Sequence, residues 1–96
     1  MARLNWTLQA EMDLKNIYIF ISSDSKRYAA IHIKRIREKA KLLKQQPSLG
    51  RVVPEIGDEN IRELIFGNYR IIYRKMNPEQ IDILTIYHSS RLLKII

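Results

Sequence analysis

The chain has 96 residues, room for one small core, and 46% of them are hydrophobic, which excludes an intrinsically disordered chain. It contains no cysteine, which excludes a disulfide scaffold, a thiolate nucleophile and cysteine-ligated zinc. We find neither a signal peptide nor an apolar run of about 20 residues. We therefore expect one soluble, cytoplasmic domain over residues 1–96, with no contact to a membrane.

The net charge of +7 is unevenly distributed along the chain. The segment from Lys26 to Arg51 contains nine basic residues and one acidic residue, Glu38, whereas the rest of the chain is nearly neutral. A local positive field of this kind attracts nucleic acid, anionic lipid or an acidic protein partner. The alternative interpretation is a solvated helix face on a basic protein.

The first half of the chain predicts a strand followed by a helical hairpin. Residues 2–6 alternate apolar and polar side chains, as in a short strand. Thr7 is placed to cap a helix from Leu8 to Ser22. The polar stretch 22–25 interrupts the helical pattern, and a second helix from Lys26 to Gln45 ends before a proline and a glycine. Because the interruption is short, the two helices should pack antiparallel.

Past the second helix the pattern changes from helical to alternating and predicts three strands, at residues 61–66, 69–76 and 81–87. Gly67-Asn68 and residues 77–80 form the turns between them, so these strands should form an antiparallel meander. The predicted fold is α+β in the order β-α-α-β-β-β. Its helical hairpin packs on one face of a mostly antiparallel four-stranded sheet.

The last two predicted strands are apolar on both faces, and a helical hairpin can cover only one of them. The other face should present Ile and Tyr side chains beside Arg70 and Arg74. A mixed apolar and cationic surface of this kind is typical of a binding site. A homodimer interface is the alternative for this surface.

No metal or cofactor site is expected, because the sequence has only two histidines, at no ligand spacing, and no glycine-rich loop. One set of residues could carry chemistry. A ribonuclease that uses the 2′-hydroxyl needs a base, an acid and a cation. Arg70 and His88, with a carboxylate from Glu55 or Glu63, could supply them. The structural alternative is that Arg70 pairs with Glu63 and His88 only ends the strand.

The register of the last hairpin separates these two interpretations. With residues 77–80 as a four-residue loop, Arg70 shares a sheet face with Tyr87. With a three-residue loop the register slips by one residue, and Arg70 then shares a face with His88.

Several short motifs resemble one known family. They are Trp6-Thr7 before the first helix, Gly50-Arg51-Val52-Val53-Pro54-Glu55, Arg62-Glu63-Leu64, Tyr69-Arg70-Ile71-Ile72-Tyr73-Arg74, and Ile83-Leu84 followed by His88 and Arg91. In order and spacing they resemble the RelE/ParE superfamily of type II toxins, and they are closer to ParE-like plasmid-stabilisation toxins. The resemblance spans nearly the whole chain.

The resemblance implies a bacterial toxin that inhibits DNA gyrase. The alternative branch, RelE- or YoeB-like, consists of ribosome-dependent mRNA endoribonucleases, in which Arg70, His88 and Glu55 would be catalytic. The stretch between Arg51 and Phe66 has no lysine-rich catalytic strand, which favours the ParE branch. A third possibility is a non-toxic basic module that binds nucleic acid.

The resemblance also implies a partner. Members of both branches are neutralised by a cognate antitoxin, expected here to be acidic and DNA-binding and to form a hetero-oligomer with the toxin. The residues expected to contact the antitoxin or the target are Arg51, Arg62, Tyr69, Tyr73, Arg74, Tyr87 and Arg91.

Overall fold

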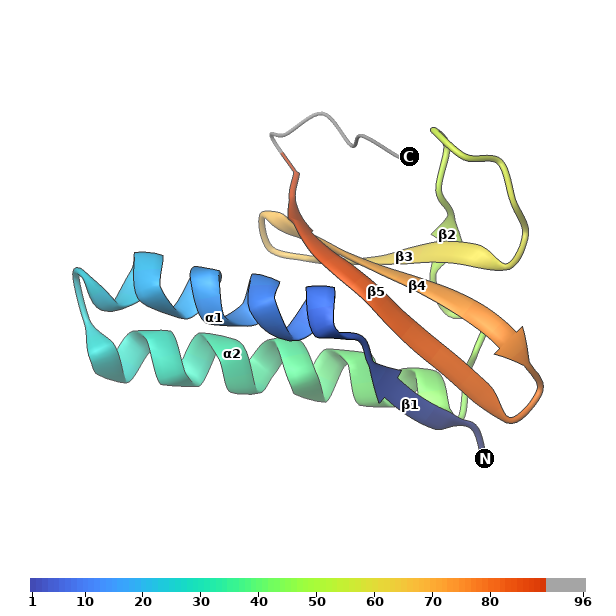
Figure 1. Cartoon of the computed structure of the whole chain (residues 1–96), viewed down its shortest axis with the longest axis horizontal. Coiled ribbons are helices and arrows are strands. Elements are labelled where there is room, and N and C mark those ends of the chain that lie inside the picture. Colours follow the sequence, from blue (N-terminus) through green and yellow to red (C-terminus); the bar gives the residue numbers. More distant parts are fainter. Residues whose placement is uncertain (90–96) are drawn as a thin grey trace.

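The computed structural model describes residues 1–89 and shows two helices on one face of a mixed sheet (Figure 1). In chain order the elements are β1 (Arg3–Trp6), α1 (Leu8–Ser22), α2 (Lys26–Lys41), the 3-10 turn η1 (Leu42–Lys44), β2 (Arg51–Val52), β3 (Ile61–Phe66), β4 (Tyr69–Asn77) and β5 (Gln80–His88). Strands lie in the order β1-β5-β4-β3-β2, with β1 parallel to β5 and every other pair antiparallel. No helix in residues 1–89 is long and apolar enough to span a bilayer.

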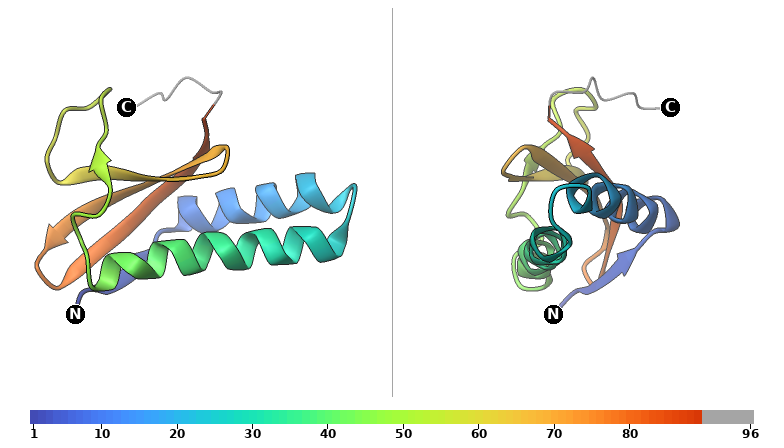
Figure 2. Two further views of the ribbon diagram at one scale, coloured as in Figure 1. Left: turned by 180° about the vertical axis from the view of Figure 1, so that it is seen from behind. Right: turned by 90° about the vertical axis from the view of Figure 1, so that its left-hand side faces the viewer.

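The α+β class and the helical hairpin on one sheet face are confirmed, but the sheet has five strands and not four. The additional strand is β2, which contains only Arg51 and Val52. Two residues are too few to produce an alternating pattern, so sequence periodicity cannot reveal a strand of this length. Figure 2 shows both helices beneath the sheet, with the far end of the hairpin projecting beyond it.

Side-chain caps fix where the two helices begin. The hydroxyl of Thr7 accepts a hydrogen bond from the Ala10 N–H, and the hydroxyl of Ser25 accepts one from the Tyr28 N–H. Each satisfies a backbone donor that the first turn of a helix leaves free. The predicted bounds of the first helix are confirmed. The second ends its α-helical part at Lys41 and tightens into η1, short of the predicted end at Gln45.

The main core lies between the helices and the near face of the sheet. The helices contribute buried residues at helical spacing and the strands contribute them at alternate positions. The members with no exposed surface are Ala10, Ile36, Ala40, Leu43, Ile71, Tyr73, Ile81 and Ile83.

A second, smaller cluster lies on the far face of the sheet. Val53 and Ile72 are buried there, with Ile56, Leu84 and Tyr87 packed against them. The segment that follows β2 therefore folds over part of this face. We expect from the sequence that the far face is open and apolar, and this expectation is wrong for the part around Ile72, which keeps only 2% of its surface exposed.

The β4–β5 hairpin has a two-residue loop, with Asn77 opposite Gln80, and two one-residue shifts of register. Met76 is the extra residue on β4 and Leu84 is the extra residue on β5, so the shifts cancel. Beyond the second shift Arg70 lies opposite Tyr87. Arg70 therefore shares a sheet face with Tyr87, as expected for a four-residue loop, although the loop has two residues and the register is restored by the two shifts.

Candidate functional site

Four charged side chains of alternating sign form a network on the far face of the sheet. Arg70 on β4 donates from Nε to Glu63 on β3, at 2.5 Å. Its two terminal nitrogens donate to both carboxylate oxygens of Glu55, at 2.8 and 2.9 Å. Arg51 on β2 donates from Nε to the second oxygen of Glu63, at 2.5 Å. The network thus ties β2, β3, β4 and the segment after β2 together.

Two members of this network, Glu63 and Arg70, are buried, so each depends on its partners to remain charged. The Glu63 side chain has no exposed surface and the Arg70 side chain keeps 10%. A carboxylate removed from water requires opposite charge and hydrogen bonds to remain ionised, and two guanidinium groups supply both here. The paired hydrogen bonds from Arg70 lower the pKa of Glu55 to about 2. The hydrogen bond to Glu55, followed by that to Glu63, raises the pKa of Arg70 against the effect of burial.

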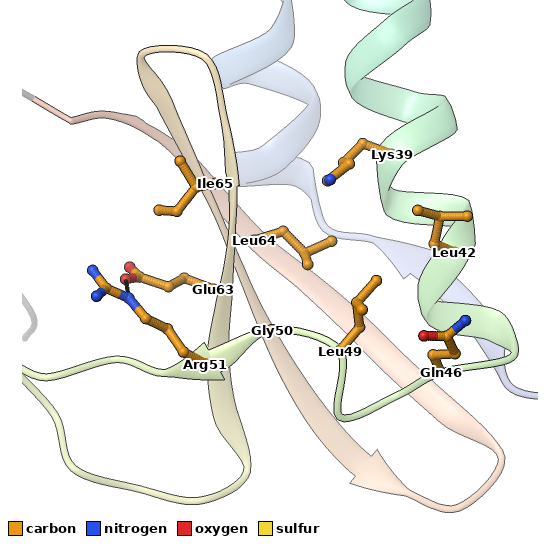
Figure 3. Close-up of a pocket in the computed structure, with 9 residues that line it drawn as sticks. All are labelled: Lys39, Leu42, Gln46, Leu49, Gly50, Arg51, Glu63, Leu64 and Ile65. Carbon is orange, nitrogen blue, oxygen red and sulfur yellow. Dashed lines mark hydrogen bonds and ion pairs between the residues drawn. The ribbon is translucent and has the colours of Figure 1, made fainter.

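A groove of about 410 Å³ lies beside this network, between the end of α2 and the outer edge of β3 (Figure 3). Its lining includes Leu42, Leu49, Leu64 and Ile65, with Lys39 and Arg51 as cations. Three of the apolar side chains are exposed, Leu42 and Ile65 by 48% each and Leu49 by 42%. The groove therefore combines apolar side chains with polar and charged ones, Gln46, Lys39 and the Arg51–Glu63 pair.

The same groove runs along an unpaired strand edge. The strand β2 pairs only with Arg62 and Glu63 of β3. Among residues 1–89, no strand lies on this side of β3 from Leu64 to Phe66. Backbone N–H and C=O groups at such an edge can accept an added strand from another chain.

Gly50 lets the chain pass close to the sheet at this point. Its N–H donates to the Tyr73 hydroxyl at 3.0 Å, and that hydroxyl donates to the Pro47 carbonyl at 2.9 Å. A Cβ on Gly50 would overlap the Glu63 carbonyl oxygen and lie 2.8 Å from the Tyr73 side chain. Only glycine fits here without displacing the backbone of Glu63. The Tyr73 hydroxyl that Gly50 contacts is buried, and this burial raises its pKa.

Three residues expected to contact a partner are placed in the interior or in backbone contacts. Tyr73 is fully buried, which corrects its expected role as a binding residue. The Arg62 guanidinium donates to the carbonyl oxygens of Glu59 and Gly50, so it holds the segment around β2. Tyr69 packs against the main core.

The other expected binding residues lie on the far face or beyond the described chain. Arg51 has a side chain that is 64% exposed although it pairs with Glu63. Arg74 is exposed on β4, and Tyr87 is half-buried opposite Arg70. Arg91 lies outside the described residues.

The structure does not bring Arg70 and His88 together. His88 lies opposite Tyr69, with the two ring centroids 5.3 Å apart, on the face that the helices cover. Arg70 is the next residue after Tyr69 and points to the other face. The pairing of Arg70 with Glu63 is confirmed. Of the three residues of the ribonuclease hypothesis, Arg70 and Glu55 are in contact, whereas His88 lies on the other face of the sheet.

Sequence reasoning missed the groove at the edge of β3 and the exposed end of the hairpin. Figure 1 shows this end of the hairpin projecting beyond the sheet. Ile19, Phe20 and Tyr28, close to the turn between the helices, are exposed by 56%, 76% and 55%. The sequence could have indicated that Ile65 is exposed, because Ile65 follows Leu64 on a predicted strand and neighbouring side chains of a strand point to opposite faces. The depth of the groove depends on where β2 ends, and the sequence pattern does not give that point.

A helical hairpin on one face of a mixed sheet is the architecture expected of the small α+β toxins that the sequence resembles. Here the charged network lies on the other face of the sheet, and the groove lies at the β3 edge. The family model described as "ParE toxin of type II toxin-antitoxin system, parDE" matches residues 4–93. The chain belongs to this family, and it is the ParE-like toxin component of a type II toxin–antitoxin system with a cognate antitoxin as partner.

A solved structure supports the same assignment. A chain from the "Chromosomal ParDE TA system from P. aeruginosa" is 26% identical and superimposes with a TM-score of 0.75. The alignment covers 92% of this chain and 96% of that chain. No curated protein matches the sequence.

Proposed function

We propose that this toxin acts in the cytoplasm as a single domain that inhibits DNA gyrase, and that an acidic, DNA-binding antitoxin neutralises it. The observation that carries the proposal is the ParE family match over residues 4–93. The position of Arg70 supports the choice of branch. Glu55 and Glu63 occupy its guanidinium, and His88 lies on the other face of the sheet.

Purified gyrase tests the target directly. Addition of the toxin to gyrase, ATP and relaxed plasmid should stop supercoiling and increase the amount of cleaved DNA. Relaxation by a type I topoisomerase under the same conditions should remain unchanged. If saturating toxin leaves both supercoiling and cleavage by gyrase unaffected, the proposed target is wrong.

The antitoxin is proposed to bind in the groove beside β3. An extended segment can pair with the free edge from Leu64 to Phe66 and place apolar side chains against Leu42 and Leu49. The cations Lys39 and Arg51 at the rim favour a segment with acidic side chains. This arrangement would also cover the exposed Ile65.

Two matched substitutions test this placement. Ile65 and Met76 are both 48% exposed on strands, but only Ile65 lines the groove. A carboxylate in the groove would face the acidic segment proposed to bind there and should cost more than about 1.4 kcal/mol, so Ile65→Glu should weaken antitoxin binding by about tenfold or more in titration calorimetry. Met76→Glu should change the Kd by less than about twofold. Equal effects of the two variants would place the antitoxin elsewhere.

A further inference from the structure

The helix α2 carries positive charge that the protein does not neutralise. Eight basic residues lie on α2 and η1, against the single acidic residue Glu38. They are Lys26, Arg27, Lys34, Arg35, Arg37, Lys39, Lys41 and Lys44. Among residues 1–89 only one of these, Arg37, forms an ion pair, with Glu11 at 2.5 Å. By contrast, Arg51 and Arg70 on the sheet are both paired with carboxylates. The free positive field of the described chain is therefore concentrated on this helix.

Three of these cations form a line on the side of α2 that faces solvent. Arg27, Lys34 and Lys41 are all exposed and follow one another at seven-residue spacing, which keeps them on one face of a helix. A rise of 1.5 Å per residue places neighbours about 10.5 Å apart, in a line of roughly 21 Å. The buried residues Ala29 and Ile36 lie on the opposite side. In Figure 2, α2 is a straight rod along the side of the molecule away from the sheet.

The composition of this line favours a phosphate backbone over a protein surface. A protein interface needs apolar or aromatic side chains at its centre. Of the exposed large hydrophobic residues of α2, Tyr28 lies about 100° around the helix from Arg27 and Ile31 about 40°, so both border the line on the same side. The line itself consists of cations alone, and Glu38, exposed between Lys34 and Lys41, is the one acidic residue of α2 beside it. Contact with a phosphate backbone needs only such exposed cations and supplies binding that is independent of sequence.

We propose that the outer face of α2 binds the phosphate backbone of duplex DNA without reading its sequence, and that in the gyrase complex it contacts the DNA that gyrase holds. The second part rests on the proposed function, whereas the first part concerns the toxin alone. The toxin would then contact both the gyrase protein and the DNA bound to it.

Binding to bare duplex DNA tests the first part. Fluorescence anisotropy with a labelled duplex of arbitrary sequence should show binding whose affinity falls with salt. Three phosphate contacts give a slope of about −2.7 in log K against log salt, or roughly a 40-fold loss between 50 and 200 mM. The triple variant Arg27→Gln, Lys34→Gln, Lys41→Gln should lose most of this slope. Circular dichroism should show the variant folded, because the three side chains are exposed and glutamine is a good helix former.

A second triple variant controls for net charge. Arg3→Gln, Lys15→Gln, Lys75→Gln removes the same charge from positions outside α2 and should retain the salt slope and the affinity within about threefold. Equal loss in both triple variants would overturn the proposal, because the binding would then follow net charge alone. The proposal is also wrong if duplex DNA does not bind while poly-glutamate binds and is lost in the α2 variant, since the face would then fit an acidic protein.

Gyrase assays separate this inference from the proposed function. If the wild-type toxin fails to inhibit gyrase, the proposed target is wrong, and the binding of bare DNA by α2 is decided by the anisotropy result. If the wild type inhibits gyrase and the α2 triple variant inhibits it at the same concentration despite lost DNA binding, the contact with gyrase-held DNA is overturned. A several-fold rise in the toxin concentration needed for inhibition, in the α2 variant and not in the control, supports it.

Discussion

At the scale of single residues, the chemistry of the far sheet face is dominated by charges that neutralise one another. Glu63 is enclosed between Arg51 and Arg70, and its side chain has no exposed surface. Burial of a carboxylate is tolerated only while its partners remain, so the network favours one arrangement of β2, β3 and β4. Arg70, which the sequence presents as a candidate catalytic cation, therefore serves as a structural cross-link.

Removal of one charge from the network should reveal this role. Glu63→Gln keeps the shape of the side chain but leaves the buried Arg70 guanidinium short of a counter-charge. We expect the free energy of unfolding to fall by about 3 kcal/mol, the lower end for a broken buried pair, because Glu55 remains as a partner. Urea unfolding measures this loss, and Glu79→Gln on the exposed β4–β5 loop is the control. A loss below about 1 kcal/mol for Glu63→Gln would show that solvent reaches the network.

The pKa of Glu55 makes the same network sensitive to acid. Its folded-state pKa is lowered from 4.5 to about 2 because Arg70 donates two hydrogen bonds to the carboxylate. A lowered pKa contributes stability above the unfolded value, and that contribution is lost as the pH falls from about 4.5 towards 2. The free energy of unfolding of the wild type should therefore fall more steeply over this window than that of Glu55→Gln. Parallel curves for the two proteins would contradict the assigned shift.

At the scale of elements, the sequence predicts what depends on period and on local capping. Thr7 and the polar stretch before Lys26 indicate both helix starts, because a cap is a property of neighbouring residues. The sequence does not predict β2 or the two compensating shifts at Met76 and Leu84. Those features depend on contacts between distant segments, such as the close approach of Gly50 to β3. The sequence therefore does not predict the groove, because its position depends on where β2 ends beside β3.

Thr7 links local capping to long-range contact, and its substitution should show both. Its hydroxyl accepts from the Ala10 N–H and lies within hydrogen-bonding distance of the Ile83 and Leu84 carbonyl oxygens on β5. Thr7→Ala should cost about 2 kcal/mol in urea unfolding. Ser25→Ala removes a cap of α2 alone and should cost about 1 kcal/mol. Thr7→Ser retains the hydroxyl and should recover most of the loss. Equal costs for Thr7→Ala and Ser25→Ala would mean that the contact with β5 contributes nothing.

At the scale of the whole molecule, the two layers present different surfaces. On the sheet, Arg51 and Arg70 are paired with carboxylates, and the groove lies between the β3 edge and the end of α2. Among the basic residues of α2, by contrast, Arg37 is the one that forms an ion pair within the described chain. The groove includes Lys39 of α2, whereas the outward line of α2 consists of Arg27, Lys34 and Lys41, so the two surfaces share no residue.

The sheet also joins distant parts of the chain, since β1 pairs in parallel with β5 and Leu4 lies opposite Ile81. Removal of residues 1–6 should expose the edge of β5 and take Ala2, Leu4 and Trp6 out of the main core. Burial of such side chains contributes a large part of a total stability of roughly 5–15 kcal/mol. The shortened chain should therefore lose its cooperative urea transition and show a reduced m-value.

A short Gly-Ser extension before Met1 is the control for a change at this end of the chain. Because Met1 is 88% exposed, the extension should leave the urea unfolding transition unaltered. The shortened and the extended chain should differ because only the shortened chain loses the pairing of β1 with β5. This pairing joins the two ends of the described fold, since every other helix and strand lies between β1 and β5 in the sequence. If the shortened chain keeps the wild-type m-value, the helical hairpin and the β2–β5 strands fold without β1, and the parallel pairing only covers an edge that is already stable.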